Sequence, residues 1–267
     1  MSSIDDVFAA CAAEKRPAFI PFLMAGDPDL ETTPRLLEAA VAGGADIVEL
    51  GVPFSDPIAD GPVNQRAAAR ALAAGTHLSD VLRMVARHRD ALDVPIVLFT
   101  YFNPVHALGV ERFAEQAAAS GLDAVLVVDL PPEEAETELL PALRDHGLHT
   151  IFLLSPTSTK QRVQRVVAAS TGFVYYVSRT GVTGERDELP RDLQRSLKRL
   201  RRRLPLPLVV GFGISNREQV ASLRKCVDGV VVGSALVRVV EEHGNVAELP
   251  ALLEERVAEL SGRAARR

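Results

Sequence analysis

Cysteine is scarce in this sequence of 267 residues, which contains only Cys11 and Cys226. The two form no CxxC motif and no disulfide framework, and neither has an obvious histidine partner beside it. Few and unpaired cysteines are typical of proteins in a reducing compartment, where they are usually buried thiols. We therefore expect a cytoplasmic protein.

Long apolar runs are also absent. No stretch approaches the ~20 apolar residues of a membrane helix, and the first residues lack a signal-peptide pattern. The hydrophobic content of 47% and charged content of 24% are typical of a water-soluble globular protein. The net charge of −5 argues against nucleic acid as a partner. The basic residues of 198–203 share a helical pattern with leucines, so we interpret them as a solvated helix face.

The short motifs of several enzyme classes are missing. His146 and His149 flank Gly147 at the end of a predicted helix, and the other histidines are scattered. No metal-ligand spacing results, and we expect no metal. There is no P-loop and no nucleophile elbow. The turn after the first predicted strand, residues 26–28, is not the GxGxxG of dinucleotide-binding folds.

What the chain does contain is eight apolar runs, each followed by a helical pattern. Near-continuous apolar runs are typical of parallel strands that are buried on both faces. Their strict alternation with helices predicts an α/β fold, a TIM (β/α)8 barrel with a short extra N-terminal helix over 2–14. A doubly wound open sheet is the alternative, and we expect a single domain over 1–267. The predicted strands are 18–24, 46–50, 95–100, 122–128, 150–154, 172–177, 207–211 and 229–232. The predicted helices are 33–42, 63–73, 78–91, 110–119, 133–145, 159–169, one that begins at Leu189, 216–225 and a helical region over 234–260.

The stretch ELGVPFSDPIADGP, residues 49–62, breaks the apolar pattern. Glu49 lies in an apolar predicted strand, where an unpaired carboxylate becomes neutral by a rise of its pKa. Asp60 lies on the following loop, which three prolines stiffen. Two carboxyl groups in different environments can act as general acid and general base, so we expect both to be catalytic. The alternatives are a hidden core partner for Glu49 and a turn-capping role for Asp60.

Other polar and aromatic residues follow strands at the same end of the predicted barrel, where barrel enzymes place their active sites. Asp129 can either serve the site or cap the next helix. The tyrosines can be core aromatics. The candidates that this rule selects are Tyr101, Asn103, Asp129, Tyr175, the loop over 178–184 and Phe212.

Glycines after the last two predicted strands indicate an anion site. Gly211, Gly213 and Gly233 allow backbone N–H groups to approach an anion, and Ser234 opens a helix whose N-terminus favours negative charge. Barrels often bind phosphate at this place, and Gly184 could add a further donor. The alternative is that these glycines only make tight turns.

Several runs resemble the tryptophan synthase alpha chain family in order and spacing: ELGVPFSDPIADGP, SRTGVTGER, VVGFGIS and VVVGSA, together with PFLMAGDPDLE and VLVVDLPPEE. The resemblance extends from Phe8 to Leu260. It implies a TIM barrel that cleaves indole-3-glycerol phosphate to indole and glyceraldehyde 3-phosphate. That reaction is a retro-aldol step of tryptophan biosynthesis, and it needs no cofactor on this chain.

The resemblance also implies residue roles. Glu49 would protonate C3 of the indole and assist the glycerol hydroxyl, and Asp60 would stabilise charge at the indole nitrogen. Thr183 would close over the site and interact with Asp60. The implied phosphate site consists of Gly184, Gly213, Gly233 and Ser234. The expected substrate pocket consists of Phe22, Asn64, Tyr101, Asp129, Tyr175, Thr183 and Phe212.

A partner is implied as well: a pyridoxal-phosphate beta chain in an α2β2 heterotetramer, which receives the indole. The loop over 53–60 would take part in communication between the subunits. Two residues depart from the usual family pattern, because Met24 replaces a common Thr and Asn64 a common Ile. A polar amide beside an apolar ring is unfavourable unless it is hydrogen-bonded. We hypothesise that Asn64 alters the packing of the indole or admits a substituted indole.

Three alternatives remain beside the alpha subunit. A free-standing lyase would release indole to a specialised pathway. A catalytically weak barrel would mainly activate a beta subunit, although the presence of both Glu49 and Asp60 argues against it. Another phosphate-binding barrel, such as a phosphoribosyl isomerase, would explain the glycines but not the stretch around Glu49.

Overall fold

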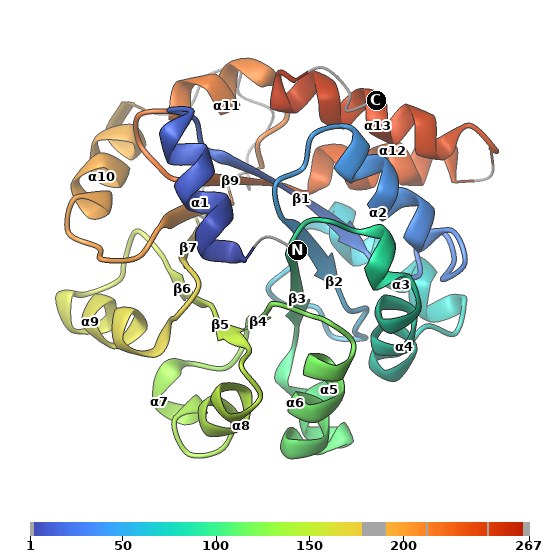
Figure 1. Ribbon diagram of the computed structural model, residues 1–267, viewed down its shortest axis with the longest axis horizontal. Helices are drawn as coiled ribbons and strands as arrows, with labels where there is room; N and C mark the ends of the chain where they lie inside the picture. The colour runs from blue at the N-terminus through green and yellow to red at the C-terminus, as the bar shows by residue number, and fades with distance from the viewer. Residues whose placement is uncertain (1–2, 178–190, 212, 245, 264–267) are drawn as a thin grey trace.

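The computed structural model describes residues 3–177, 191–211, 213–244 and 246–263. Within them, nine strands form one sheet in the order β5-β4-β3-β2-β1-β9-β8-β7-β6. The strands at the two ends of this order, β5 (His149–Thr150) and β6 (Phe152–Leu154), are consecutive pieces of chain separated only by Ile151. The sheet therefore closes into a barrel surrounded by helices, which confirms the TIM barrel and excludes the open sheet (Figure 1).

All strand pairs are parallel, and most strand residues are buried, as the apolar runs predicted. Successive residues within each strand point alternately into the barrel interior and toward the layer beneath the helices, because side chains in a strand have a period of two. Apart from β5 and β6, the strands are β1 (Ala18–Met24), β2 (Val48–Gly51), β3 (Ile96–Thr100), β4 (Ala124–Val127), β7 (Val174–Val177), β8 (Leu208–Gly211) and β9 (Gly229–Val232).

Most helices also occur where the sequence predicted them. The N-terminal helix begins after Ser3, whose hydroxyl accepts a hydrogen bond from the Asp6 N–H while the Asp6 carboxylate accepts from the Ser3 N–H. The helices that match predictions are α1 (Ile4–Ala13), α2 (Thr33–Ala42), α3 (Pro62–Ala73), α4 (Leu78–His88) with the 3-10 turn η1 (Arg89–Ala91), α6 (Val110–Ala119), α9 (Lys160–Ala169), α10 (Arg191–Arg201) and α11 (Arg217–Leu223).

One helix was not predicted, and one predicted helix was wrong in its extent. Helix α5 (Phe102–Leu108) was missed because Asn103-Pro104 resembles a turn, although proline is tolerated in the first turn of a helix. The predicted helix 133–145 is two helices, α7 (Pro132–Ala135) and α8 (Leu139–Asp145), because Pro141 cannot lie in the interior of one long helix and lies instead in the first turn of α8. The helical region predicted over 234–260 is confirmed and consists of α12 (Ser234–His243) and α13 (Leu249–Ser261), with Gly244 after the first and Pro250 in the first turn of the second.

Helix α1 closes one end of the barrel. Phe8 and Cys11 belong to the same apolar cluster as the inward-facing strand residues, and the Phe8 ring packs edge-on against Phe173 at a centroid distance of 5.8 Å. Figure 1 shows this helix lying across the barrel. The strands begin on the side of α1, where Phe8 lies beside Gly229, the first residue of β9. Their carboxyl ends therefore lie at the opposite end of the barrel, which carries the predicted site.

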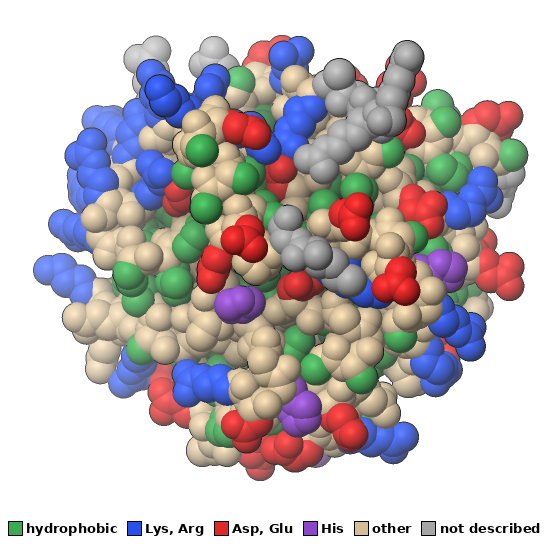
Figure 2. All heavy atoms as spheres, in the orientation of Figure 1, with side chains coloured by type: hydrophobic (Ala, Val, Ile, Leu, Met, Phe, Trp, Pro, Cys, Tyr) green, Lys and Arg blue, Asp and Glu red, His purple; other side chains and the backbone are tan. Residues whose placement is uncertain are grey.

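The basic surface predicted for 198–203 lies on α10 and the turn after it. Leu197 is completely buried, whereas Lys198, Arg199 and Arg202 are exposed. Figure 2 shows the corresponding concentration of basic side chains over this helix. The interpretation as a solvated helix face is confirmed. Among the described helices, none combines the length and the apolar character needed to cross a membrane.

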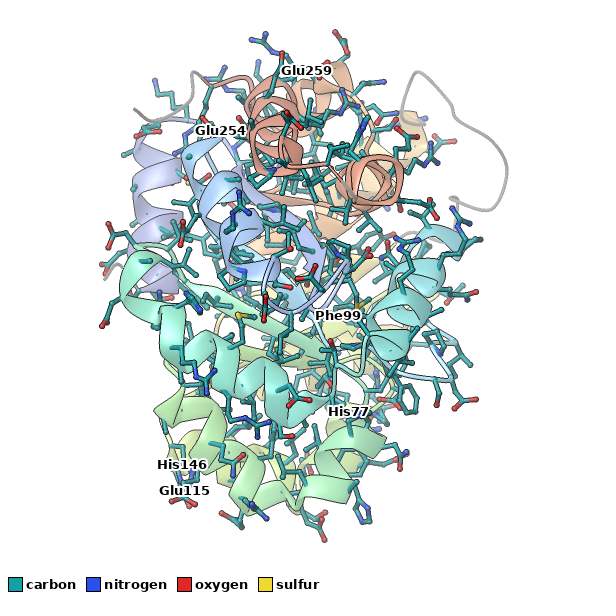
Figure 3. All side chains as sticks on the ribbon, turned by 90° about the vertical axis from the view of Figure 1, so that its right-hand side faces the viewer. His77, Phe99, Glu115, His146, Glu254 and Glu259 are labelled. Atoms are coloured by element: carbon teal, nitrogen blue, oxygen red, sulfur yellow. The ribbon has the colours of Figure 1, made fainter. Side chains whose placement is uncertain are left out.

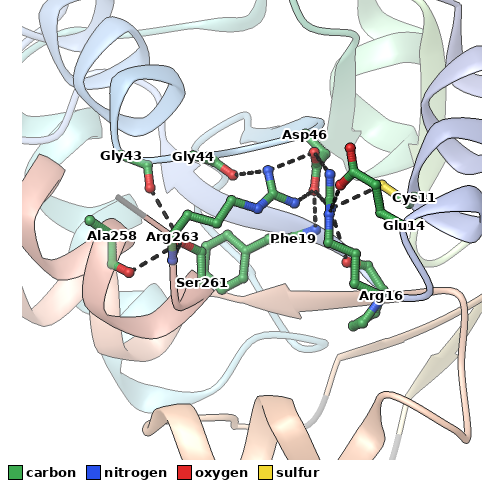
Figure 4. Close-up of polar contacts among 11 residues, drawn as sticks. Cys11, Glu14, Arg16, Phe19, Gly43, Gly44, Asp46, Ala258, Ser261 and Arg263 are labelled. Atoms are coloured by element: carbon green, nitrogen blue, oxygen red, sulfur yellow. Dashed lines mark hydrogen bonds and ion pairs between the residues drawn. The ribbon is translucent and has the colours of Figure 1, made fainter. Parts of the chain in front are cut away.

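A buried carboxylate at the α1 side of the barrel binds residues that follow the first and the last helix. Asp46 is 5% exposed and accepts hydrogen bonds from the Phe19 N–H at 2.8 Å and from the guanidinium groups of Arg16 and Arg263. Figure 4 shows the two guanidinium groups converging on this carboxylate. Arg16 follows α1 and Arg263 follows α13, so one side chain connects the first and the last helix to the start of β2.

We expect Asp46→Ala to lower the free energy of unfolding by about 3 kcal/mol, because two partly buried guanidinium groups lose their counter-charge. Urea denaturation at pH 7 measures this difference. The control is Asp192→Ala, which breaks an exposed pair with Arg195 and should leave stability close to that of the parent. An equal loss in the two variants would contradict the structural role of Asp46.

Candidate active site

The register of the sheet places Glu49 inside the barrel. Its neighbours across the sheet are Phe22 in β1 and Val97 in β3, which both belong to the interior apolar cluster. The residues beside it in the strand, Val48 and Leu50, belong instead to the cluster beneath the helices. The alternation of β2 therefore directs the Glu49 side chain inward, among apolar groups, near the open end of the barrel.

Glu49 is unusual in its electrostatic environment. Its side chain is 1% exposed, and its Oε1 atom has no hydrogen-bond partner among the described residues. Burial and, to a lesser extent, the negative charge of Asp60 raise the pKa of Glu49 from its ordinary value of 4.5 to about 8. The hidden core partner considered from the sequence is thus not found in the described part of the chain. A carboxyl group with this pKa can both donate and accept a proton near neutral pH.

Asp60 is held on the loop between β2 and α3 by Tyr101. The Tyr101 hydroxyl donates to Asp60 Oδ2 at 2.7 Å and accepts from the Ala59 N–H at 3.0 Å. The Tyr101 ring is buried and packs against Phe54 at a centroid distance of 5.0 Å. Burial raises the pKa of Asp60, and hydrogen bonds from Tyr101 and Asn64 partly oppose this rise. The loop thus presents a carboxylate whose charge acts on Glu49.

Aromatic side chains surround these carboxyl groups. Phe22 packs edge-on against Phe99 at a centroid distance of 5.3 Å, and Figure 3 labels Phe99 among the strands. Tyr175 of β7 is almost completely buried. Its burial and the charges of Glu49 and Asp60 raise its pKa well above the ordinary value, so its hydroxyl stays neutral. The pair Phe22 and Tyr175 provides the apolar surroundings that an aromatic ligand requires.

Tyr175 occupies its position only because residue 211 has no side chain. A Cβ atom at Gly211 would lie 2.2 Å from the Tyr175 hydroxyl oxygen and 2.8 Å from two ring carbons. We expect Gly211→Ala to displace the ring and to lower kcat/KM by about 100-fold, since small displacements in a site have effects of this size. The double variant Gly211→Ala/Tyr175→Phe lacks the hydroxyl oxygen, which is the closest atom. The added methyl group should therefore lower kcat/KM less in the Tyr175→Phe background than it does in the parent, and the double variant should be more active than Gly211→Ala. A double variant no better than Gly211→Ala would contradict this steric explanation.

The predicted phosphate site lies where β8 and β9 end side by side. Gly211 pairs with Val231 across these strands, so Gly213 and Gly233 follow at the same end of the sheet. Gly213 has φ +60, a conformation that side chains rarely adopt, and apart from its chain neighbours no atom of the described residues lies within 4 Å of the position of a Cβ. Ser234 is the first residue of α12, whose leading N–H groups have no partner within the helix. Backbone donors are therefore available for an anion.

The sequence left open whether Asp129 caps the helix that follows it. In the structure it does not cap this helix, α7. Its carboxylate accepts a hydrogen bond at 2.8 Å from the Phe102 N–H, in the first turn of α5. It therefore positions the segment next to Tyr101. Of the remaining expected residues, Gly184, Thr183 and Phe212 lie outside the described part of the chain, as does the whole loop over 178–184.

A network of ion pairs that no sequence motif indicated joins the two sides of the site. Arg70 of α3 donates two hydrogen bonds of 2.8 Å to buried Asp27 and one of 2.9 Å to Glu241 of α12. Arg66 also binds Glu241 through two nitrogens. The network thus connects the helix that follows Asp60 to the helix that begins at Ser234. No sequence pattern could have found it, because Arg70 and Glu241 are 171 positions apart.

Comparisons with known proteins identify the family. The family described as "Tryptophan synthase alpha chain" matches residues 8–263. The curated tryptophan synthase alpha chain of Solibacter usitatus is 50% identical over 260 residues, which cover 97% of each chain. The tryptophan synthase subunit alpha of Legionella pneumophila has a similar structure, with a TM-score of 0.90, 36% identity and 98% coverage of both chains. A chain of the Pyrococcus furiosus tryptophan synthase complex gives a TM-score of 0.83, 41% identity and coverage of 92% and 98%.

These matches extend over nearly the whole chain and leave the phosphoribosyl isomerase alternative without support. The sheet order, the buried Glu49 beside Asp60 and the glycines at the ends of β8 and β9 agree with them. The chain therefore belongs to the tryptophan synthase alpha chain family, and its activity is the lyase cleavage of indole-3-glycerol phosphate in tryptophan biosynthesis.

Proposed function

We propose that Glu49 is the acid–base residue of this cleavage and that Asp60 stabilises the charge that develops on the indole ring. The observation that carries the proposal is the buried Glu49 carboxyl, whose pKa is about 8 and whose Oε1 atom has no hydrogen-bond partner among the described residues. A group of this pKa is poised for proton transfer at physiological pH. The neighbouring Asp60 accepts hydrogen bonds from Tyr101 and Asn64, and in this proposal it carries the negative charge.

The steps follow from the chemistry of the substrate. Protonated Glu49 donates its proton to C3 of the indole, which places positive charge on the ring nitrogen next to Asp60. The resulting Glu49 carboxylate accepts the proton of the hydroxyl on the carbon attached to C3. The bond between that carbon and C3 then breaks, its electrons return to the ring, and the hydroxyl carbon becomes an aldehyde. Glu49 is protonated again, and indole and glyceraldehyde 3-phosphate are the products.

The other candidate residues bind and orient the substrate in this proposal. Phe22 and Tyr175 contact the indole, and the backbone at Gly213, Gly233 and Ser234 holds the phosphate. Phosphate binding far from the reacting carbon fixes the orientation of the substrate. For Gly184, Thr183 and Phe212 we propose the roles that the family resemblance implies: a phosphate donor, closure over Asp60 and a wall of the pocket. No cofactor takes part.

We further propose a single-domain cytoplasmic subunit that works with a beta chain. The Pyrococcus furiosus relative belongs to a tryptophan synthase complex. Ile58 supports an interface on the loop over 53–60, because this apolar side chain is 85% exposed only two positions from Asp60. Burial of Ile58 by a partner would be favourable and would act directly on the loop that carries Asp60.

The test is turnover of indole-3-glycerol phosphate by the purified chain, with and without a tryptophan synthase beta chain. We expect weak turnover alone and strong stimulation by the beta chain. Ile58→Asp should raise the concentration of beta chain needed for half-maximal stimulation by at least 10-fold. The control is Val246→Asp, which changes the other large exposed apolar residue of the described chain, between α12 and α13.

Other outcomes would favour the alternatives. Full turnover without a beta chain would indicate a free-standing lyase. Absence of turnover in both conditions, with stimulation of the beta reaction, would indicate a barrel that only activates its partner. Equal stimulation of Ile58→Asp and the parent would remove the proposed interface from this loop.

A further inference from the structure

Asn64 is a polar residue in direct contact with the catalytic loop. It is the third residue of α3 and lies four positions after Asp60. Its side chain forms a hydrogen bond with the Asp60 carboxylate, which partly opposes the rise that burial causes in the pKa of Asp60. A carboxylate only accepts hydrogen bonds, so the amide NH2 group of Asn64 is the donor. This bond fixes which end of the amide faces Asp60.

The other end of the same amide has no hydrogen-bond partner in the described part of the chain. The Asn64 Oδ1 atom is buried, and it accepts no hydrogen bond from the residues that the structure describes. In that part of the chain only two other buried side-chain oxygen atoms share this property, Glu49 Oε1 and Ser170 Oγ. Glu49 and Asn64 both interact with Asp60, so two of the three unsatisfied acceptors belong to residues that interact with one carboxylate. Such an acceptor is unfavourable until a donor reaches it.

The substrate explains one of these two atoms. In the proposed function, Glu49 exchanges protons with C3 and with the glycerol hydroxyl. Asp60 accepts the ring N–H of the indole, so an unsubstituted ring has no donor left for Asn64. The amide carbon alone separates Oδ1 from the nitrogen that binds Asp60. A donor attached to the edge of the ring, beside the part that contacts Asp60, would be within reach of Oδ1.

We propose that Asn64 is a specificity-determining residue that accepts, through Oδ1, a hydrogen bond from a hydroxyl or amino group on the indole ring, while its amide NH2 positions Asp60. The preferred ligands are thus ring-substituted indoles with a hydrogen-bond donor, as free indoles and as their glycerol phosphates. This inference rests on the proposed function for the location of the ring beside Asp60. It assigns two linked roles to one amide.

Equilibrium binding tests the acceptor role. The probes are indole and matched pairs of hydroxyindole and methylindole, substituted at each position of the six-membered ring, with affinities from calorimetry. At one position at least, the parent should bind the hydroxyindole 10-fold or more tightly than the methylindole, because a site that hydrogen-bonds a hydroxyl discriminates against analogues without it. In Asn64→Leu, which keeps the side-chain size, this preference should disappear. The absence of a hydroxyl preference at every position, or its persistence in Asn64→Leu, would overturn the proposal.

The pH dependence of turnover tests the positioning role. Removal of the Asn64 donor raises the pKa of Asp60, so the acid limb of kcat/KM for plain indole-3-glycerol phosphate should move to higher pH in Asn64→Leu. Asn64→Gln keeps the amide and should move this limb less. An unchanged limb in Asn64→Leu would refute the contact with Asp60.

The two proposals fail in different ways. Turnover of the plain substrate by the parent, without any preference for hydroxyindoles, would refute only the role of Asn64. Absence of turnover would refute the proposed function, whereas the binding series with free indoles would still test Asn64.

Discussion

The Glu49→Gln variant should lose the cleavage reaction and gain stability at alkaline pH. Glutamine has nearly the same shape but neither donates nor accepts a proton at neutral pH, so kcat/KM should fall by about 10²–10⁴-fold. The opposite change in stability follows from the buried carboxyl group, whose pKa is raised from 4.5 to about 8 in the folded chain. Glutamine has no charged form, so it avoids the unfavourable ionisation of this group inside the barrel.

The sign of the pH effect follows from linkage. The folded chain holds the Glu49 proton more tightly than the unfolded chain does. The stability associated with this proton is fully present below pH 4.5 and is lost as the pH rises through 8. The free energy of unfolding of Glu49→Gln should therefore equal or approach that of the parent near pH 4.5 and exceed it increasingly up to about pH 8.

Urea denaturation from pH 5 to 9 and single-turnover kinetics measure the two effects. The matched variant Glu49→Asp keeps a carboxyl group but shortens its reach, so it should retain more activity than Glu49→Gln and should keep the pH-dependent loss of stability. Two variants with the same pH profile of stability would show that ionisation of Glu49 is not the cause. Retained cleavage in Glu49→Gln would refute the acid–base role.

The second large effect is expected for Asp60→Asn, with a fall of kcat/KM by about 10²–10³-fold. Asparagine can still accept the Tyr101 hydrogen bond, so the loop should keep its position, but no negative charge remains beside the ring nitrogen. The charge of Asp60 also contributes to the raised pKa of Glu49. The alkaline limb of the residual activity should therefore move to lower pH.

The pH–rate profile of Asp60→Asn, compared with those of the parent and Tyr101→Phe, measures this prediction. Tyr101→Phe leaves the carboxylate but removes its hydroxyl donor, which raises the pKa of Asp60 and should move the acid limb to higher pH. Its fall in activity should be smaller than that of Asp60→Asn. An alkaline limb that stays in place in Asp60→Asn would show that the two carboxyl groups do not interact.

Much of the site was predictable because its signals are local in the sequence. A carboxylate in an apolar strand is unfavourable wherever that strand is buried, so Glu49 was identified without knowledge of its neighbours. Glycines directly after strands, at Gly213 and Gly233, indicated an anion site for the same reason. The alternation of apolar strands and helices predicted a parallel α/β fold, because both faces of every strand need apolar cover. The order of the strands in the sheet then excluded the open-sheet alternative.

Contacts between distant residues could not be predicted in this way. Tyr101 meets Asp60 across 41 positions, and the carboxylate of Asp129 reaches the Phe102 N–H rather than the helix that follows it. The requirement for Gly211 also depends on Tyr175, which lies on the neighbouring strand. Each of these pairs arises from the register between strands or from the path of a loop, which no single segment of sequence contains.

The sequence by itself thus determined which strand carries the acidic group, which turns admit an anion, and that the strands and helices alternate. The tertiary structure alone decided that Glu49 has no partner among the described residues, that Asp60 is close enough to raise its pKa, and that Asn64 is hydrogen-bonded to Asp60. The physical reason is that polarity and periodicity are properties of a segment. Burial, the strength of a neighbouring charge and the satisfaction of a hydrogen bond depend instead on distances across the closed barrel.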